Sequence, residues 1–215
     1  MIQKIKKYSV AILAVAILVG CASKEEEEYN KPAVYWYNKM IKQIATYRLD
    51  EADSTFTSLE SEHRNSPLLP SATLIIANAH MQEEEYAMAN YYLDEYLKKH
   101  ISSNDLDYVK FLKIKSNFLA FKNQFREQEL ITKTIDEVEK FLIEYPNSQY
   151  KYIVMDIKSR LYMAKAVFDK EIADLYSRIE KPQAQKIYEK KSQESWAQTS
   201  SIKNVDVPWY RWIFE

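Results

Sequence analysis

Glycine and cysteine are almost absent from this chain, which has one of each in 215 residues. The two stand side by side as Gly20 and Cys21, at the end of a segment with the layout of a secretory leader. Phosphate-binding loops, dinucleotide-binding turns and the nucleophile elbow of hydrolases all need glycine for positive φ or close backbone approach. If the leader is removed, the mature chain can contain none of them, which argues against an enzyme.

The leader has a positive region with three lysines, an apolar run from Ser9 to Val19, and small residues after it. The run has 11 residues, whereas a membrane-spanning helix needs about 20. Leu18-Val19-Gly20-Cys21 resembles the bacterial lipobox, in which the leader is cut before the cysteine and the cysteine is lipidated. This resemblance implies a signal peptide over residues 1–20 and a covalent lipid on Cys21. Residues 21–31, with four consecutive glutamates, then form an extended tether.

The scarcity of thiols and histidines further limits the catalytic and metal-binding chemistry that this chain can perform. With Cys21 lipidated, no thiol is left, which excludes disulfides, zinc thiolates and cysteine catalysis. Removing three leader lysines changes the formal charge from −1 to −4, which argues against nucleic acid as the main partner. His63, His80 and His100 lack the spacing of metal ligands, so we expect no metal, no catalytic residue and no cofactor besides the lipid. His63 and His100 fall near predicted helix C-termini, where positive charge is favourable.

Proline and helix-capping residues divide the mature chain at nearly regular intervals. The breaks fall at Pro32, Pro67 and Pro70, residues 102–105, Pro146 and Pro182, in steps of 34 to 42 residues. Proline fits the first turn of a helix, and Ser, Asn and Asp are favoured N-caps. A period in the thirties is the length of a helix–turn–helix repeat.

Between the breaks, apolar residues recur at helical spacing. The stripes are Ala52, Phe56 and Leu59; Tyr86, Ala89, Leu93 and Tyr96 or Leu97; Ile131, Ile135, Val138, Leu142 and Tyr145; Tyr150, Val154, Ile157, Leu161 and Ala164; and Ile172, Leu175, Tyr176 and Ile179. Trp36, Ala52-x3-Phe56 and Pro67 follow the tetratricopeptide pattern, and Ala89-x3-Leu93 repeats it 37 residues later. We therefore predict an all-α, tetratricopeptide-like solenoid of about four helical hairpins plus a C-terminal helix and tail. An irregular helical bundle is the alternative.

The concave wall of such a solenoid is lined by the first helix of each hairpin and binds extended or helical peptides. On this register the groove candidates are Tyr37, Ile41, Leu74, Asn78 and Met81. The alternative places several of them in the core.

The tail, residues 200–215, has four aromatic residues among its last nine. Trp, Tyr and Arg are typical anchors of protein interfaces, so the candidates for docking a partner are Trp209, Tyr210, Arg211, Trp212 and Phe214. Two alternatives are that the tail caps the last helices, as the ends of solenoids require, or that it contacts the membrane–water boundary.

One segment, Phe141 to Tyr150 (FLIEYPNSQY), resembles a segment of the BamD-type (YfiO/ComL) outer-membrane assembly lipoproteins. Asp107-Tyr108 at a helix start, Arg126-x-Gln128 and the stretch 169–176 extend the resemblance. The ending PWYRWIFE, residues 208–215, is similar to a short branch of the family in campylobacter-like bacteria.

The resemblance implies a non-enzymatic subunit of the β-barrel assembly machinery, lipid-anchored at the periplasmic face of the outer membrane. The N-terminal repeats, 32–100, would receive unfolded barrel proteins, and the C-terminal repeats, 101–199, would dock the periplasmic domains of the barrel-forming subunit. Ala22 after the cysteine agrees with the outer membrane, since aspartate there would suggest inner-membrane retention. Two other hypotheses are a pilotin or scaffold lipoprotein for a secretin or pilus ring, and a cell-wall hydrolase with a helical superstructure.

Overall fold

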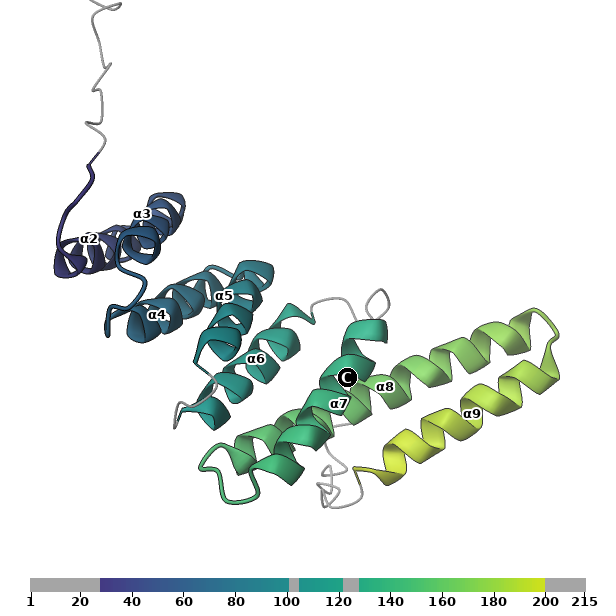
Figure 1. The fold of residues 1–215 in the computed structure, drawn as a ribbon. Coiled ribbons are helices and arrows are strands. Elements are labelled where there is room, and N and C mark those ends of the chain that lie inside the picture. The colour runs from purple at the N-terminus through teal and green to yellow at the C-terminus, as the bar shows by residue number, and fades with distance from the viewer. Residues whose placement is uncertain (1–27, 101–104, 122–127, 200–215) are drawn as a thin grey trace, which may run out of the picture. The chain divides into compact units, whose positions relative to one another are not determined.

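The computed structural model describes residues 28–100, 105–121 and 128–199; the predicted leader, Cys21 and the tail lie outside these ranges. Within them the chain forms α-helices and no strands (Figure 1), which confirms the all-α prediction. None of these helices is both long and apolar enough to cross a membrane. The helices are α2 (Ala33–Ala45), α3 (Leu49–Glu62), α4 (Leu69–Gln82), α5 (Tyr86–Lys99), α6 (Leu106–Ala120), α7 (Gln128–Glu144), α8 (Lys151–Arg178) and α9 (Pro182–Ala197).

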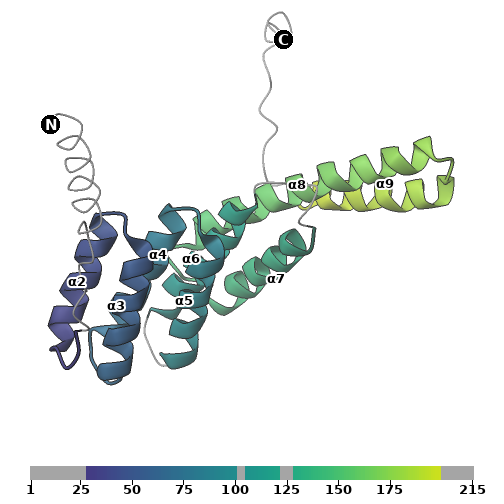
Figure 2. The same ribbon diagram turned by 90° about the horizontal axis from the view of Figure 1, so that it is seen from above.

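The helices pair into four hairpins, α2–α3, α4–α5, α6–α7 and α8–α9, and each hairpin packs against the next one along the chain. The first helices of neighbouring hairpins also meet, α2 with α4 and α6 with α8. Figure 2 shows this consecutive order, with α8 and α9 continuing past α7. The arrangement is the predicted stack of helical hairpins, and it belongs to one compact unit that begins at Ala33.

A continuous hydrophobic core runs from α2 to the first half of α8. It contains most of the predicted stripes, because residues three and four apart share one face of a helix. Its members include Ala52, Phe56, Leu59, Ala89, Leu93, Tyr96, Ile131, Ile135, Val138, Val154, Ile157 and Leu161. Burial of one large apolar side chain contributes about 1.5–3 kcal/mol, so the core is the main source of stability for the stack.

Three of the hairpin turns use a left-handed residue that is not glycine. Tyr47, Glu84 and Glu180 have φ of 59°, 64° and 55°. In each turn the next residue donates its N–H to the carbonyl five positions earlier, closing the helix end. These bonds are Arg48 to Gln43 at 3.0 Å, Glu85 to His80 at 2.8 Å and Lys181 to Tyr176 at 2.9 Å. Larger residues thus adopt the left-handed conformation that glycine usually takes in such turns. Each does so at a conformational free-energy cost of roughly 1–2 kcal/mol.

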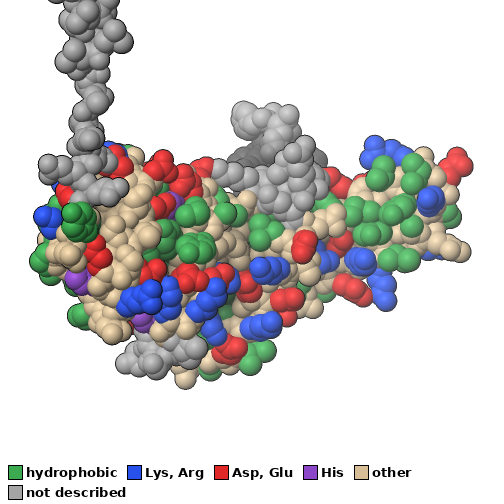
Figure 3. Space-filling view, turned by 45° about the horizontal axis from the view of Figure 1, so that its top comes forward, with side chains coloured by type: hydrophobic (Ala, Val, Ile, Leu, Met, Phe, Trp, Pro, Cys, Tyr) green, Lys and Arg blue, Asp and Glu red, His purple; other side chains and the backbone are tan. Residues whose placement is uncertain are grey.

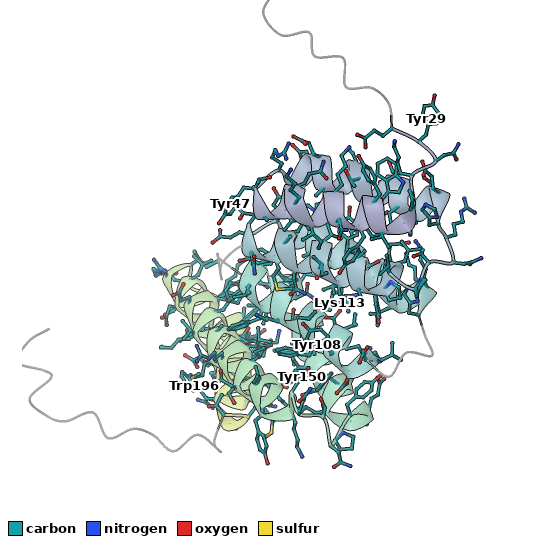
Figure 4. The ribbon with its side chains drawn as sticks, turned by 90° about the vertical axis from the view of Figure 1, so that its left-hand side faces the viewer. Tyr29, Tyr47, Tyr108, Lys113, Tyr150 and Trp196 are labelled. Carbon is teal, nitrogen blue, oxygen red and sulfur yellow. The ribbon has the colours of Figure 1, made fainter. Side chains whose placement is uncertain are left out.

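The turn between α7 and α8 is anchored to the beginning of α6. The Tyr150 ring stacks on Phe111, with centroids 4.6 Å apart, and lies 5.4 Å from the Tyr108 ring (Figure 4). Ser148 Oγ donates a hydrogen bond of 2.7 Å to Asp107 and accepts the Tyr150 N–H at 3.2 Å. Through Ser148 and Tyr150, these contacts hold the turn against the first turns of α6.

Helix α8 carries two of the predicted stripes on one uninterrupted helix of 28 residues. The first stripe ends in the core at Leu161. Beyond it, α8 pairs with α9, and Ser192 Oγ donates to the Ala166 carbonyl at 2.8 Å. Leu175 and Ile179, of the second stripe, are each 49% exposed.

Candidate peptide-binding and docking surfaces

The predicted groove residues lie on α2 and α4, but they differ in accessibility. Tyr37, Ile41 and Leu74 are half-buried and pack against the core. Asn78 is half-buried, and its Nδ2 donates to the Leu74 carbonyl at 2.8 Å. Met81 is only 6% exposed and belongs to the core, so its predicted place in an open groove is wrong. The reason is that α4 packs against α2, α3 and α5 and is buried on several sides.

Beside the predicted groove residues is a small hollow of about 180 Å³ between the C-terminal ends of α2 and α4. Ile44, Leu49 and Ala79 provide apolar wall, and Gln82 and Tyr47 stand at its polar side. The Tyr47 side chain is 81% exposed. The hollow has the size and character to receive one apolar side chain of a peptide.

A larger hollow of about 670 Å³ lies where the C-terminal ends of α3 and α5 meet the beginning of α4. Half of its ten lining residues carry hydroxyl or amide side chains, and Leu69 is an apolar member. The polar members are Thr57, Ser61, Asn65, Ser66 and Thr73. Groups of this kind donate and accept hydrogen bonds, as an extended peptide backbone requires.

Four titratable groups, Glu60, Arg64, Lys99 and His100, set the charge of this large hollow. Lys99 Nζ bonds Glu60 at 2.6 Å, joining α5 to α3, and this bond raises the pKa of Lys99. Burial, together with the charge of Lys99, lowers the pKa of His100. Lys99 is also paired with Glu95 at 2.9 Å, so its charge is balanced within the chain. Arg64 is the other basic group of the wall, and it favours an anionic group such as a peptide carboxylate.

A buried histidine holds the walls of these N-terminal repeats together. His80 is 1% exposed. Its Nε2 lies 2.9 Å from Asp53 Oδ1 on α3, and its Nδ1 lies 2.6 Å from Glu85 Oε2 at the start of α5. The Tyr92 hydroxyl donates to the same Asp53 oxygen at 2.7 Å, and the Tyr92 ring stacks on the imidazole. One side chain therefore connects the first hairpin to the second.

Both ring nitrogens of His80 face carboxylates, which is the arrangement that an imidazolium satisfies. Burial alone would lower the pKa of His80, but the hydrogen bonds to Asp53 and Glu85 outweigh it and hold the pKa above its ordinary value. Within the described ranges no three His, Cys, Asp or Glu side chains are placed to hold a metal ion. Sequence reasoning missed this network, because Asp53 is 27 residues from His80 and no local pattern links them.

A third cleft, of about 160 Å³, lies between α5, α6 and α7. Leu97, Ile114 and Phe141 form its apolar wall, and Lys110 and Lys113 stand at its edge. Lys110 pairs with Glu144 and Lys113 with Asp94, so these charges are largely balanced within the chain. The cleft lies at the surface where the N-terminal and C-terminal repeats meet, and its volume is that of about one side chain.

The C-terminal repeats expose apolar surface on the α8–α9 hairpin. Trp196, near the end of α9, is 46% exposed (Figure 4), and Ile187 is 56% exposed. Exposed tryptophan is typical of interface anchors. The predicted docking residues Trp209, Tyr210, Arg211, Trp212 and Phe214 and the lipidation site Cys21 lie outside the described residues and stay predictions.

Comparison with known proteins shows which family the chain belongs to. Residues 29–204 match the model of the YfiO family, described as outer membrane lipoprotein. The chain belongs to the YfiO family. It is also 36% identical over 208 residues to the outer membrane protein assembly factor BamD of Helicobacter pylori, covering 96% of this chain and 94% of that protein. The resemblance seen in the sequence is therefore confirmed, and so is the outer membrane as the location of a lipid-anchored YfiO-family protein.

The YfiO-family match, residues 29–204, contains the three hollows, the His80 network and the whole α8–α9 hairpin. Cys21 and the aromatic residues 209–214 lie outside it. The surfaces described above thus belong to the part of the chain that carries the YfiO-family pattern.

Proposed function

We propose that this chain is a non-enzymatic assembly factor for outer-membrane β-barrel proteins. The observation that carries the proposal is the similarity to the BamD of Helicobacter pylori over nearly the full length of both chains. A stack of helical hairpins with hollows lined by hydrogen-bonding and charged groups supports a binding role, because such surfaces take up extended or helical peptides.

The N-terminal repeats, 32–100, bind segments of unfolded barrel proteins in this proposal. The hollow of about 670 Å³ provides hydroxyls and amides for a peptide backbone, with Arg64 for a carboxylate. Tyr37, Ile41, Leu74 and Asn78 form a second contact strip on α2 and α4. The network around His80 keeps the three helices α3, α4 and α5 at fixed positions, so less ordering is needed when a peptide binds.

The C-terminal repeats, 101–199, dock the barrel-forming subunit through its periplasmic domains. The exposed Trp196 supports this assignment, since tryptophan often supplies a large share of interface energy.

Depletion of the protein tests the function. We expect the amounts of many outer-membrane barrel proteins to fall together, as measured by quantitative mass spectrometry of outer membranes. In a second experiment, we expect the barrel-forming subunit to co-purify with the tagged chain from solubilised membranes. If one secretin or pilus ring is lost while barrel proteins stay normal, the assembly function is wrong and the pilotin alternative is favoured.

A further inference from the structure

The apolar stripe of α8 continues beyond the part of the helix that the core covers. Val154, Ile157 and Leu161 belong to the core. Ile172, Leu175 and Ile179 follow 11, 14 and 18 residues after Leu161. These separations are close to whole turns of a helix, so the three residues lie near the same face as the core residues. Leu175 and Ile179 are each 49% exposed. The helix therefore presents a core-type face where none of the described helices covers it.

Helix α9 adds Ile187 to this exposed face. The antiparallel helices are aligned by the bond from Ser192 to Ala166 and by the stacked rings of Tyr176 and Tyr188. This alignment places Ile187 level with the last turns of α8. Around the axis of α9, Ile187 lies about 110° from the residues that face α8, on the same side of the hairpin as Leu175 and Ile179. We call these three residues the open side of the hairpin. Figure 3 shows hydrophobic side chains gathered on the hairpin, at the right of the view.

The residues that follow α9 have the composition and the length to cover the open side. Half of residues 200–215 are apolar, and most of these fall at the end of the tail. The distance along α9 from Thr199 back to Ile187 is about 18 Å at 1.5 Å per residue. The ten residues from 200 to 209 can span about 33 Å when extended, so the aromatic residues can reach the entire open side.

We propose that residues 208–214 of this chain lie on the open side of the α8–α9 hairpin and cover Leu175, Ile179 and Ile187. Within the described residues, no further hairpin packs on this side of α8–α9, and an apolar face of a solenoid that no repeat covers needs a cap. The tail is joined to this hairpin, so its local concentration there is far above that of a separate chain. The proposal concerns the chain's own cap and does not depend on the docking function.

Engineered cysteines test this position in the full lipidated chain, purified in detergent, in which the predicted lipid on Cys21 leaves no other thiol. We expect the pair Ile187→Cys and Trp212→Cys to form an intramolecular disulfide on oxidation, seen as a faster-migrating monomer on a non-reducing gel. The matched control pairs Trp212→Cys with Glu189→Cys, an exposed position two residues away on the opposite face of α9. It should give at least several-fold less of this product. Equal yields from both pairs, disulfide-linked dimers, or no disulfide would overturn the proposal.

Hydrogen exchange provides a second readout that needs no new bond. Deletion of residues 208–215 should raise exchange at the backbone amides of residues 172–179 and 185–189, and leave α4 unchanged. The proposal is wrong if the deletion changes neither segment. It is also wrong if these segments are protected only after solubilised membrane proteins are added, because a partner would then be the occupant.

Discussion

At the scale of single residues, the His80 side chain joins helices that are far apart in the sequence. Its imidazole touches Asp53 from α3 and Glu85 from the start of α5, and it stacks on Tyr92. Removal of the ring would leave Asp53, whose side chain is 25% exposed, with one charged partner fewer in a mostly desolvated place. Such a loss costs more than the bond itself contributes.

We expect the stability of the N-terminal repeats to fall as pH rises through the folded-state pKa of His80. That pKa lies above the ordinary value of 6.5, so the stabilisation is fully present below about pH 6.5 and is lost above the folded value. Thermal unfolding of the wild type and of His80→Gln, followed from pH 5.5 to 9, measures the effect. The variant should be less stable by about 1–3 kcal/mol at pH 6, with the difference shrinking at high pH. Parallel pH profiles of the two proteins would rule out a charged His80.

At the scale of elements, the hairpin turns show how helices are joined without glycine. Glu84 has φ of 64° at the centre of the α4–α5 turn. The Glu85 N–H behind it bonds the His80 carbonyl at 2.8 Å, so this strained turn also positions two members of the His80 network.

Glu84→Gly should stabilise the protein by about 0.5–1 kcal/mol. Glycine removes a left-handed penalty of roughly 1–2 kcal/mol, and part of this gain is offset by the greater entropy of glycine in the unfolded chain. Chemical denaturation measures the change. The neighbouring Glu83→Gly is the control, because Glu83 has φ of −84° and gains nothing from glycine. Equal effects at the two positions would show that backbone strain is not the cause.

The elements themselves were largely predictable from the sequence, because apolar spacing and proline breaks are local signals. Ala52, Phe56 and Leu59 are buried as expected. Met81 was placed wrongly, since spacing cannot tell a groove from a core when a helix is covered on several sides. The large hollow combines residues from Thr57 to His100 at three helix ends, and no pattern within one helix encodes it. His80 likewise depends on a partner from another helix.

At the scale of the whole molecule, the candidate surfaces lie on different hairpins of one compact unit. The large hollow belongs to α3, α4 and α5, whereas Trp196 belongs to α9, whose main contacts are with α8. Because α9 packs mainly against α8, surface substitutions on it share no partners with the lining of the large hollow, and such substitutions act independently. The two proposed activities should therefore be separable.

The variants Arg64→Glu and Trp196→Ala test this separation. Reversal of the charge at Arg64 should weaken binding of a labelled peptide from an unfolded barrel protein about tenfold, since a hydrogen bond to a charged group contributes roughly 1.5–3 kcal/mol. Fluorescence anisotropy measures this binding, with Arg160→Glu on α8 as the charge-matched control. Trp196→Ala should leave peptide binding unchanged and lower co-purification of the barrel-forming subunit. If both variants lose both activities with unaltered thermal stability, binding and docking share one surface, and the assignment of the N-terminal repeats to substrate and the C-terminal repeats to docking fails.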